Sequence, residues 1–82
     1  MSTTEVVEHL PDRFADRLPE PDRRDLAEFR DAGEWGELID LLVASLSASR
    51  APVTAAEREE LRRLMKGMSM PTNTLQKLRL AA

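Results

Sequence analysis

The stretch Gly33–Ser49, GEWGELIDLLVASLSAS, decides the fold of this 82-residue chain. It holds the only tryptophan and the one long, nearly apolar run of the sequence, at residues 38–43. Apolar residues recur here at spacings of three and four, so they share one face of an amphipathic helix. The residues on this face are Trp35, Leu38, Ile39, Leu42 and Leu46. Leu41, Val43 and Ala44 make the face wider than a surface helix needs. We therefore expect a central helix at about 33–49, contacted from more than one side.

Size and composition predict a single helical domain over residues 1–82, since a chain of this length has room for one core. There is no cysteine, which excludes disulfides and thiolate sites, and the one histidine, His9, cannot form a His-rich metal site. We expect no metal and no other cofactor. The sequence has neither an apolar run of about 18 residues nor a signal peptide at its start, so we expect no membrane segment and a cytoplasmic protein.

Prolines and glycines set the expected bounds of the first helices. The first helix is predicted over about 4–17, with a break or bend near Pro11, which lacks a backbone donor. A proline-rich corner follows, and the second helix is predicted at 21–32 with Gly33 as its terminating residue. Gly36 costs about 1 kcal/mol relative to alanine. This glycine has two interpretations, close helix packing or a loose first turn of the central helix.

The C-terminal third predicts one further helix and a short tail. Thr54 and Glu57 form a capping box that opens a helix at about 55–68. Residues 72–82 are expected to form at most a short, frayed helix whose leucines dock on the bundle. No strand-like alternation appears in the sequence. The predicted fold class is all-α, a small orthogonal bundle of four to five helices around the central helix.

Charge is unevenly distributed along the chain. Residues 1–49 carry 12 acidic and 5 basic side chains, whereas residues 50–82 carry 3 acidic and 7 basic ones. Carboxylates recur every third residue from the end of the second helix into the third. We call these five residues the acidic band: Glu28, Asp31, Glu34, Glu37 and Asp40. Because the connection between the two helices is short, we expect these carboxylates to lie together at one corner.

The acidic band has two main interpretations. The first is a docking surface for a basic partner, with fast and salt-sensitive association. The second is a solvated face, in which Glu34 and Glu37 stabilise the helix because their negative charges lie near its N-terminus. Acid–base catalysis and Ca²⁺ or Mg²⁺ binding are alternatives that we do not expect. A helical chain of this size offers little pocket to shift a pKa, and the DxDxDG pattern of a calcium loop is absent. Trp35 is either a packing residue at the core or its rim, or an exposed binding anchor.

A basic stripe on the last helix suggests another class of partner. Arg58, Arg62 and Lys66 share one face, as in a nucleic-acid-binding helix. Three glutamates on the same helix and the lack of aromatic residues for base stacking oppose this interpretation. We expect no nucleic-acid partner. A helical regulator or adaptor that binds nucleic acid or a protein remains the alternative function.

A family resemblance covers roughly residues 22–70. Residues 30–42 read RDAGEWGELIDLL, followed by a Pro-Val-Thr loop at 51–54 and by EREELRRLMKGM at 57–68. This order resembles small all-helical immunity proteins of bacterial polymorphic toxin and contact-dependent growth inhibition systems, the MafI-like group. The resemblance implies a cytoplasmic protein that binds one cognate toxin domain, often a ribonuclease, and blocks its active site. The pattern matches at Gly33 and Glu34, where it implies a role in the turn between helices.

Charge supports this expectation independently, because nuclease active sites are basic in order to bind phosphates. We expect no catalytic residues and no enzymatic activity, since no nucleophile–base pair and no phosphate-binding loop is present. We expect a one-to-one complex with a basic toxin domain. The residues predicted to contact it are Glu28, Asp31, Glu34, Trp35, Glu37 and Asp40.

Overall fold

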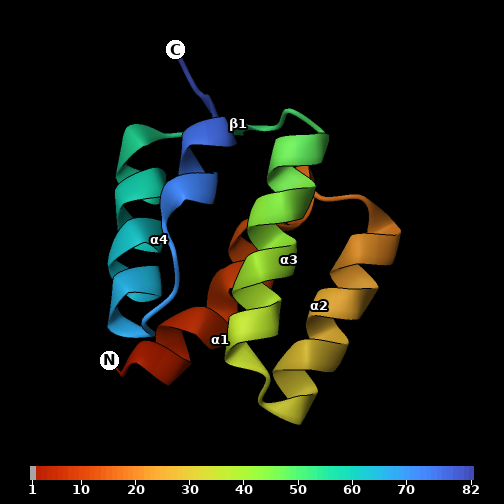
Figure 1. Cartoon of the computed structure of the whole chain (residues 1–82). Coiled ribbons are helices and arrows are strands. Elements are labelled where there is room, and N and C mark those ends of the chain that lie inside the picture. The colour runs from red at the N-terminus through yellow and green to blue at the C-terminus, as the bar shows by residue number, and fades with distance from the viewer. Residues whose placement is uncertain (1) are drawn as a thin grey trace.

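The computed structural model describes residues 2–82, and within that range it contains four α-helices (Figure 1). They are α1 (Thr3–Arg13), α2 (Glu20–Ala32), α3 (Trp35–Ala48) and α4 (Ala55–Gly67). Two 3₁₀ turns and two very short strands complete the chain. They are η1 (Ala15–Arg17), β1 (Pro52–Val53), η2 (Asn73–Lys77) and β2 (Arg79–Leu80). The predicted all-α fold class is confirmed.

Helix α3 occupies the middle of the molecule (Figure 1). Helix α2 runs antiparallel to it on one side, η2 and α4 lie on the other, and α1 passes behind. The backbones of α2 and α3 pack against each other more closely than those of any other pair of helices. The expected central helix, contacted from more than one side, is therefore present.

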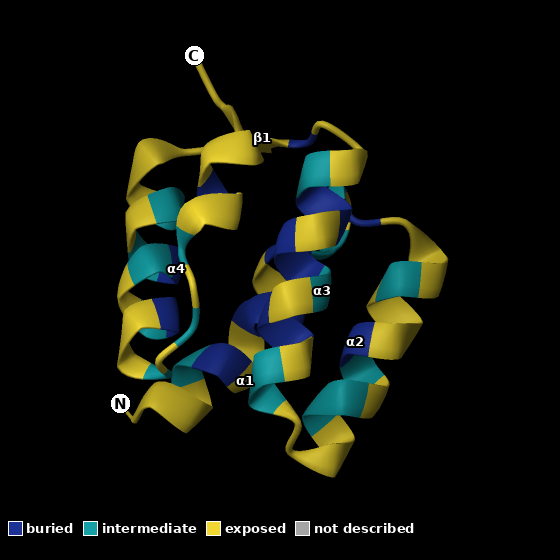
Figure 2. Cartoon of the chain, in the orientation of Figure 1, coloured by how far each residue is buried: buried dark blue, intermediate teal, exposed yellow. Residues whose placement is uncertain are grey.

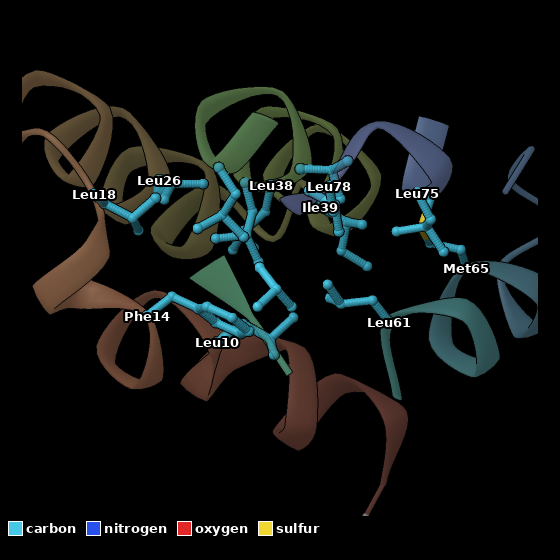
Figure 3. Packing of buried hydrophobic residues seen from close by; sticks show 14 of the residues in the cluster. Leu10, Phe14, Leu18, Leu26, Leu38, Ile39, Leu61, Met65, Leu75 and Leu78 are labelled. Carbon is cyan, nitrogen blue, oxygen red and sulfur yellow. The ribbon is translucent and has the colours of Figure 1, made fainter. Parts of the chain in front are cut away.

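The buried residues form one hydrophobic cluster, to which every α-helix contributes. Figure 2 shows that the buried positions lie on the sides of the helices that face each other. Leu10 and Phe14 from the first helical segment point toward Leu38 and Ile39 of α3, as Figure 3 shows, and Leu61 of α4 closes the cluster from the side. Helix α3 supplies the most members of this core: Leu38, Ile39, Leu42, Val43 and Leu46.

Two helix ends are built as the sequence predicts. Gly33 has a φ of 71°, in the left-handed region, and its N–H donates to the Arg30 carbonyl at 3.1 Å. The N–H of Glu34 donates to the Phe29 carbonyl at 2.9 Å, so α2 ends in a Schellman motif that turns the chain into α3. At the start of α4, the capping box between Thr54 and Glu57 is complete, with bonds of 2.9 and 3.0 Å. Both predictions are confirmed.

The first helix continues through Pro11, which is buried, and ends as an α-helix at Arg13. The change of geometry falls at Phe14, with φ −103° and ψ 7°, where the chain passes into η1. The helix predicted over about 4–17 with a break near Pro11 is therefore shorter than expected, and Pro11 lies inside it, where it removes one helical hydrogen bond without ending the helix.

The C-terminal segment is more ordered than a frayed helix. After η2, β2 pairs in parallel with β1, and the Ala81 N–H donates to the Val53 carbonyl at 2.8 Å. Leu75 is fully buried and Leu78 is 5% exposed, so the leucines of the tail do dock on the bundle. This pairing was not predicted, because strands of two residues are too short to show an alternation of apolar and polar residues.

Gly36 is not a site of close packing. A methyl group at this position would meet no side chain and no other element within 4 Å in the described part of the chain. Gly36 therefore lies in the first turn of α3, and no close contact with another element requires a glycine there. None of the helices between residues 2 and 82 has both the length and the apolar character required to cross a membrane.

Candidate interaction surface

The acidic band follows the hairpin made by α2 and α3. Residues three apart on a helix are surface neighbours, with Cβ atoms about 5–6 Å apart. Glu28 and Asp31 are therefore neighbours on α2, Glu34 lies in the turn as the N-cap of α3, and Glu37 and Asp40 are neighbours on α3. The two-residue connection through Gly33 joins the two halves of the band at one end of the molecule (Figure 1).

The five carboxylates form a band and not one compact corner. Each step of three residues turns by about 60° around a helix, so Asp40 faces about 60° away from Glu37. Asp40 accordingly lines a groove on the side of α3 that faces η2, opposite α2. The band thus begins on α2, crosses the turn and runs along α3 toward the C-terminal segment.

All five carboxylates of the acidic band are exposed to solvent. Asp31 is the only one in an ion pair within residues 2–82, at 3.7 Å from Nε of Arg30. Residues 28–40 contain five carboxylates and a single cationic side chain, which is that of Arg30. This stretch of surface therefore carries negative charge that the fold itself does not use.

The carboxylates of α4 behave differently. Glu57 accepts two hydrogen bonds from the guanidinium of Arg17, at 2.8 and 2.9 Å. Glu60 lies 2.7 Å from Arg13, and Glu59 lies 3.3 Å from Arg62. Each glutamate of α4 thus has an arginine partner. Negative charge on α4 contributes to the structure, whereas the charge of the acidic band remains available to a partner.

The Arg17–Glu57 pair holds the start of α4 to the end of the first helical segment. The Arg17 guanidinium lies 4.4 Å from the centroid of the Phe14 ring and also donates to the Pro52 carbonyl at 3.2 Å. Its hydrogen bonds, together with that from the Thr54 N–H, lower the pKa of Glu57 to about 2. The sequence predicts Glu57 in the capping box but not its pairing with Arg17, because no local pattern links residues 40 positions apart.

Trp35 begins α3, directly after Glu34 of the acidic band. It is half-buried and packs against the hydrophobic cluster, as expected for a residue at the rim of the core. The remaining part of its surface is accessible beside the first carboxylates of α3. Packing and partner contact are therefore compatible at this position.

The basic stripe of α4 is less distinct than its sequence suggests. Arg62 is paired with Glu59, and Arg58 is half-buried. Lys66 is exposed, as is the neighbouring Arg63, which lines shallow grooves together with Glu60. This surface of α4 mixes both signs of charge, so it lacks the uniform positive potential typical of a nucleic-acid face.

The described residues contain no group of three histidine, aspartate or glutamate side chains placed to hold a metal ion. No family model, no curated protein and no solved structure matches this chain.

Proposed function

We propose that this chain is an immunity protein that neutralises one cognate toxin domain in the cytoplasm. It binds a basic domain, a nuclease, in a one-to-one complex and covers the active site with the acidic band. One observation carries this proposal. The band presents five exposed carboxylates, of which only Asp31 takes part in an ion pair among residues 2–82.

In this proposal the carboxylates of the acidic band mimic the phosphates that a nuclease binds. A nuclease concentrates lysine and arginine side chains where it binds phosphates, and these cations attract any rigid array of carboxylates. Residues 28–40 present such an array on two helices that are packed against each other, so the carboxylates need little ordering on binding. Oppositely charged surfaces also steer encounter, and the association rate then falls with salt.

Trp35 adds an apolar contact next to the charges. Tryptophan is enriched among residues that dominate binding energy, and such residues lie in water-excluded contacts surrounded by polar groups. Trp35 is half-buried against the core and directly follows the exposed Glu34 of the acidic band. In this proposal its accessible edge contacts the toxin, while its packed portion holds it in place.

The test is co-expression with a basic nuclease toxin domain, sought among the reading frames that flank the gene. Wild-type chain is expected to restore growth and to abolish nuclease activity of the purified domain. Replacement of Asp31, Glu37 and Asp40 by lysine is expected to remove protection. A matched control replaces by lysine three exposed carboxylates outside the band that form no ion pair within residues 2–82, Glu5, Glu8 and Glu20, and changes the net charge by the same amount. This control is expected to protect like the wild type.

Equal protection by both triple variants would contradict the role of the acidic band. The alternative function, a helical regulator that binds nucleic acid through α4, predicts a different result. It requires that the chain bind labelled DNA or RNA at physiological salt and lose binding when Arg58, Arg62 and Lys66 are reversed. That result, with no protection by the wild type, would replace the present proposal.

A further inference from the structure

A groove of about 300 Å³ lies between α3 and η2, where the acidic band ends. Seven residues line it: Asp40, Val43, Ala44, Ser47, Ala48, Thr74 and Lys77. The methyl groups of Val43, Ala44 and Ala48 supply an apolar surface along α3. Thr74 and Lys77 belong to the opposite wall, on η2. The two alanines are exposed, so nothing within residues 2–82 covers this surface.

The charges of the groove are separated. Asp40 and Lys77 both line it, yet they form no ion pair with each other. A cation placed deep in the groove would lose water and would share the groove with a lining residue of the same charge, Lys77. An aliphatic side chain instead gains apolar contact with the alanines and displaces water from them. The groove therefore fits one apolar side chain, with a cationic neighbour on the Asp40 side.

We infer that this groove is the anchor point of the toxin contact, an inference that rests on the proposed function. It receives one leucine, isoleucine or methionine of a basic segment of the toxin, and the adjacent lysine or arginine pairs with Asp40. Charge complementarity identifies this occupant. Glu37 and Glu34 continue the negative charge from Asp40 toward the α2–α3 turn, so further cations of the segment lie along the start of α3.

The two parts of this contact have separable kinetic effects. The acidic band acts over a distance, so it raises the association rate and makes it sensitive to salt. The groove acts only after contact, through close packing, so it lowers the dissociation rate. Lys77 sets the orientation of the bound segment in the groove, because it repels the cationic end of that segment from the η2 side.

The experiment fills the groove from each wall separately. Ala44→Trp occupies it from α3 and Thr74→Trp from η2; both positions are exposed, so neither change enters the core. Ala55→Trp, at an exposed position at the start of α4, is the matched control. Thermal unfolding followed by circular dichroism establishes that each variant is folded. The probe is a displayed library of random 12-residue peptides, panned against the wild-type chain, from which enriched sequences are synthesised.

We expect enriched peptides to combine an aliphatic residue with an adjacent lysine or arginine. Their affinity, measured by fluorescence anisotropy, is expected to fall about tenfold or more in both filled variants, as for loss of a central anchor, and to stay unchanged in Ala55→Trp. Asp40→Asn is expected to weaken binding mainly at low salt. The inference is overturned if no sequence is enriched, if acidic sequences are enriched, or if both filled variants bind like the wild type.

The toxin domain of the co-expression test separates this inference from the proposed function. One outcome is that both filled variants protect as well as the wild type while the lysine triple variant does not. In that case the groove is not the anchor of the toxin contact, but the acidic band still binds the toxin. If the wild type gives no protection but the expected peptides are selected and blocked by groove filling, the groove binds basic segments and the toxin proposal fails.

Discussion

The guanidinium of Arg17 forms two hydrogen bonds with the carboxylate of Glu57, at 2.8 and 2.9 Å, across 40 positions of sequence. The pair joins η1 to the first turn of α4, and the same arginine covers the ring of the buried Phe14. Bidentate arginine–carboxylate pairs of this kind are stronger and more specific than single surface ion pairs. The attachment of α4 to the rest of the bundle therefore depends on this contact as well as on apolar packing.

A double-mutant cycle measures the coupling between Arg17 and Glu57. Glu57→Gln suits it because glutamine at this position retains the capping box. Arg17→Gln and Glu57→Gln are each expected to lower the free energy of unfolding in urea by about 1–2 kcal/mol, with a coupling of about 1 kcal/mol. The more exposed pair Glu59–Arg62 is the control, with an expected coupling of about 0.3 kcal/mol. Additive effects at Arg17 and Glu57 would show that the contact does not stabilise the fold.

The low pKa of Glu57 predicts how this stabilisation depends on pH. The Arg17 hydrogen bonds hold the folded-state pKa at about 2, below the usual 4.5. A depressed carboxyl pKa contributes stability above the unfolded-state value, and the contribution is lost as pH falls toward the folded-state value. The difference in unfolding free energy between wild type and Glu57→Gln is therefore expected to be constant from pH 7 to about 5 and to shrink between pH 4.5 and 2. A difference that stays constant down to pH 2 would contradict this assignment.

Much of the fold could be predicted because its helices carry local signals. Gly33, the Thr54 capping box and the apolar spacing of the central helix each act within a few residues of chain, so their effects are readable in sequence. The contacts that were missed are non-local. The pairing of β1 with β2 and the bond from Arg17 to Glu57 depend on how separate elements meet, and neither leaves a periodic pattern.

Leu75 tests whether the C-terminal segment is part of the core. This side chain is fully buried within the hydrophobic cluster, in a segment outside the four α-helices. Leu75→Ala is expected to lower the free energy of unfolding by about 2–4 kcal/mol, as for other buried leucines. Gln76→Ala, at an exposed neighbouring position, should leave stability nearly unchanged. A loss below about 0.5 kcal/mol for Leu75→Ala would mean that η2 is not docked in solution.

The two glycines near the α2–α3 turn should respond oppositely to alanine. Gly36 lies inside α3, where a methyl group has free space, so Gly36→Ala is expected to raise stability by about 0.5–1 kcal/mol. Gly33 has a φ of 71°, which alanine rarely adopts, so Gly33→Ala is expected to lower stability by about 1 kcal/mol. Thermal unfolding of both variants provides the comparison. Stabilisation by Gly33→Ala would contradict the Schellman termination of α2.

The sequence predicted which residues form the candidate surface better than it predicted how they are arranged in space. The spacing of three residues identified the carboxylates of the acidic band, and all five are exposed. The sequence did not reveal that Asp40 turns away from α2 into a groove, because that groove is formed with η2, which lies more than 30 residues further along the chain. A surface built by distant segments cannot be read from the spacing within one of them.

Stopped-flow association with the basic toxin domain measures whether the acidic band binds it. The wild-type association rate is expected to fall steeply as salt rises from about 50 to 500 mM, because screening shortens the reach of the charges. The variant with Asp31, Glu37 and Asp40 changed to lysine is expected to associate at least about tenfold more slowly at low salt, with little salt dependence. Equal rates and equal salt dependence for both proteins would contradict binding through the acidic band.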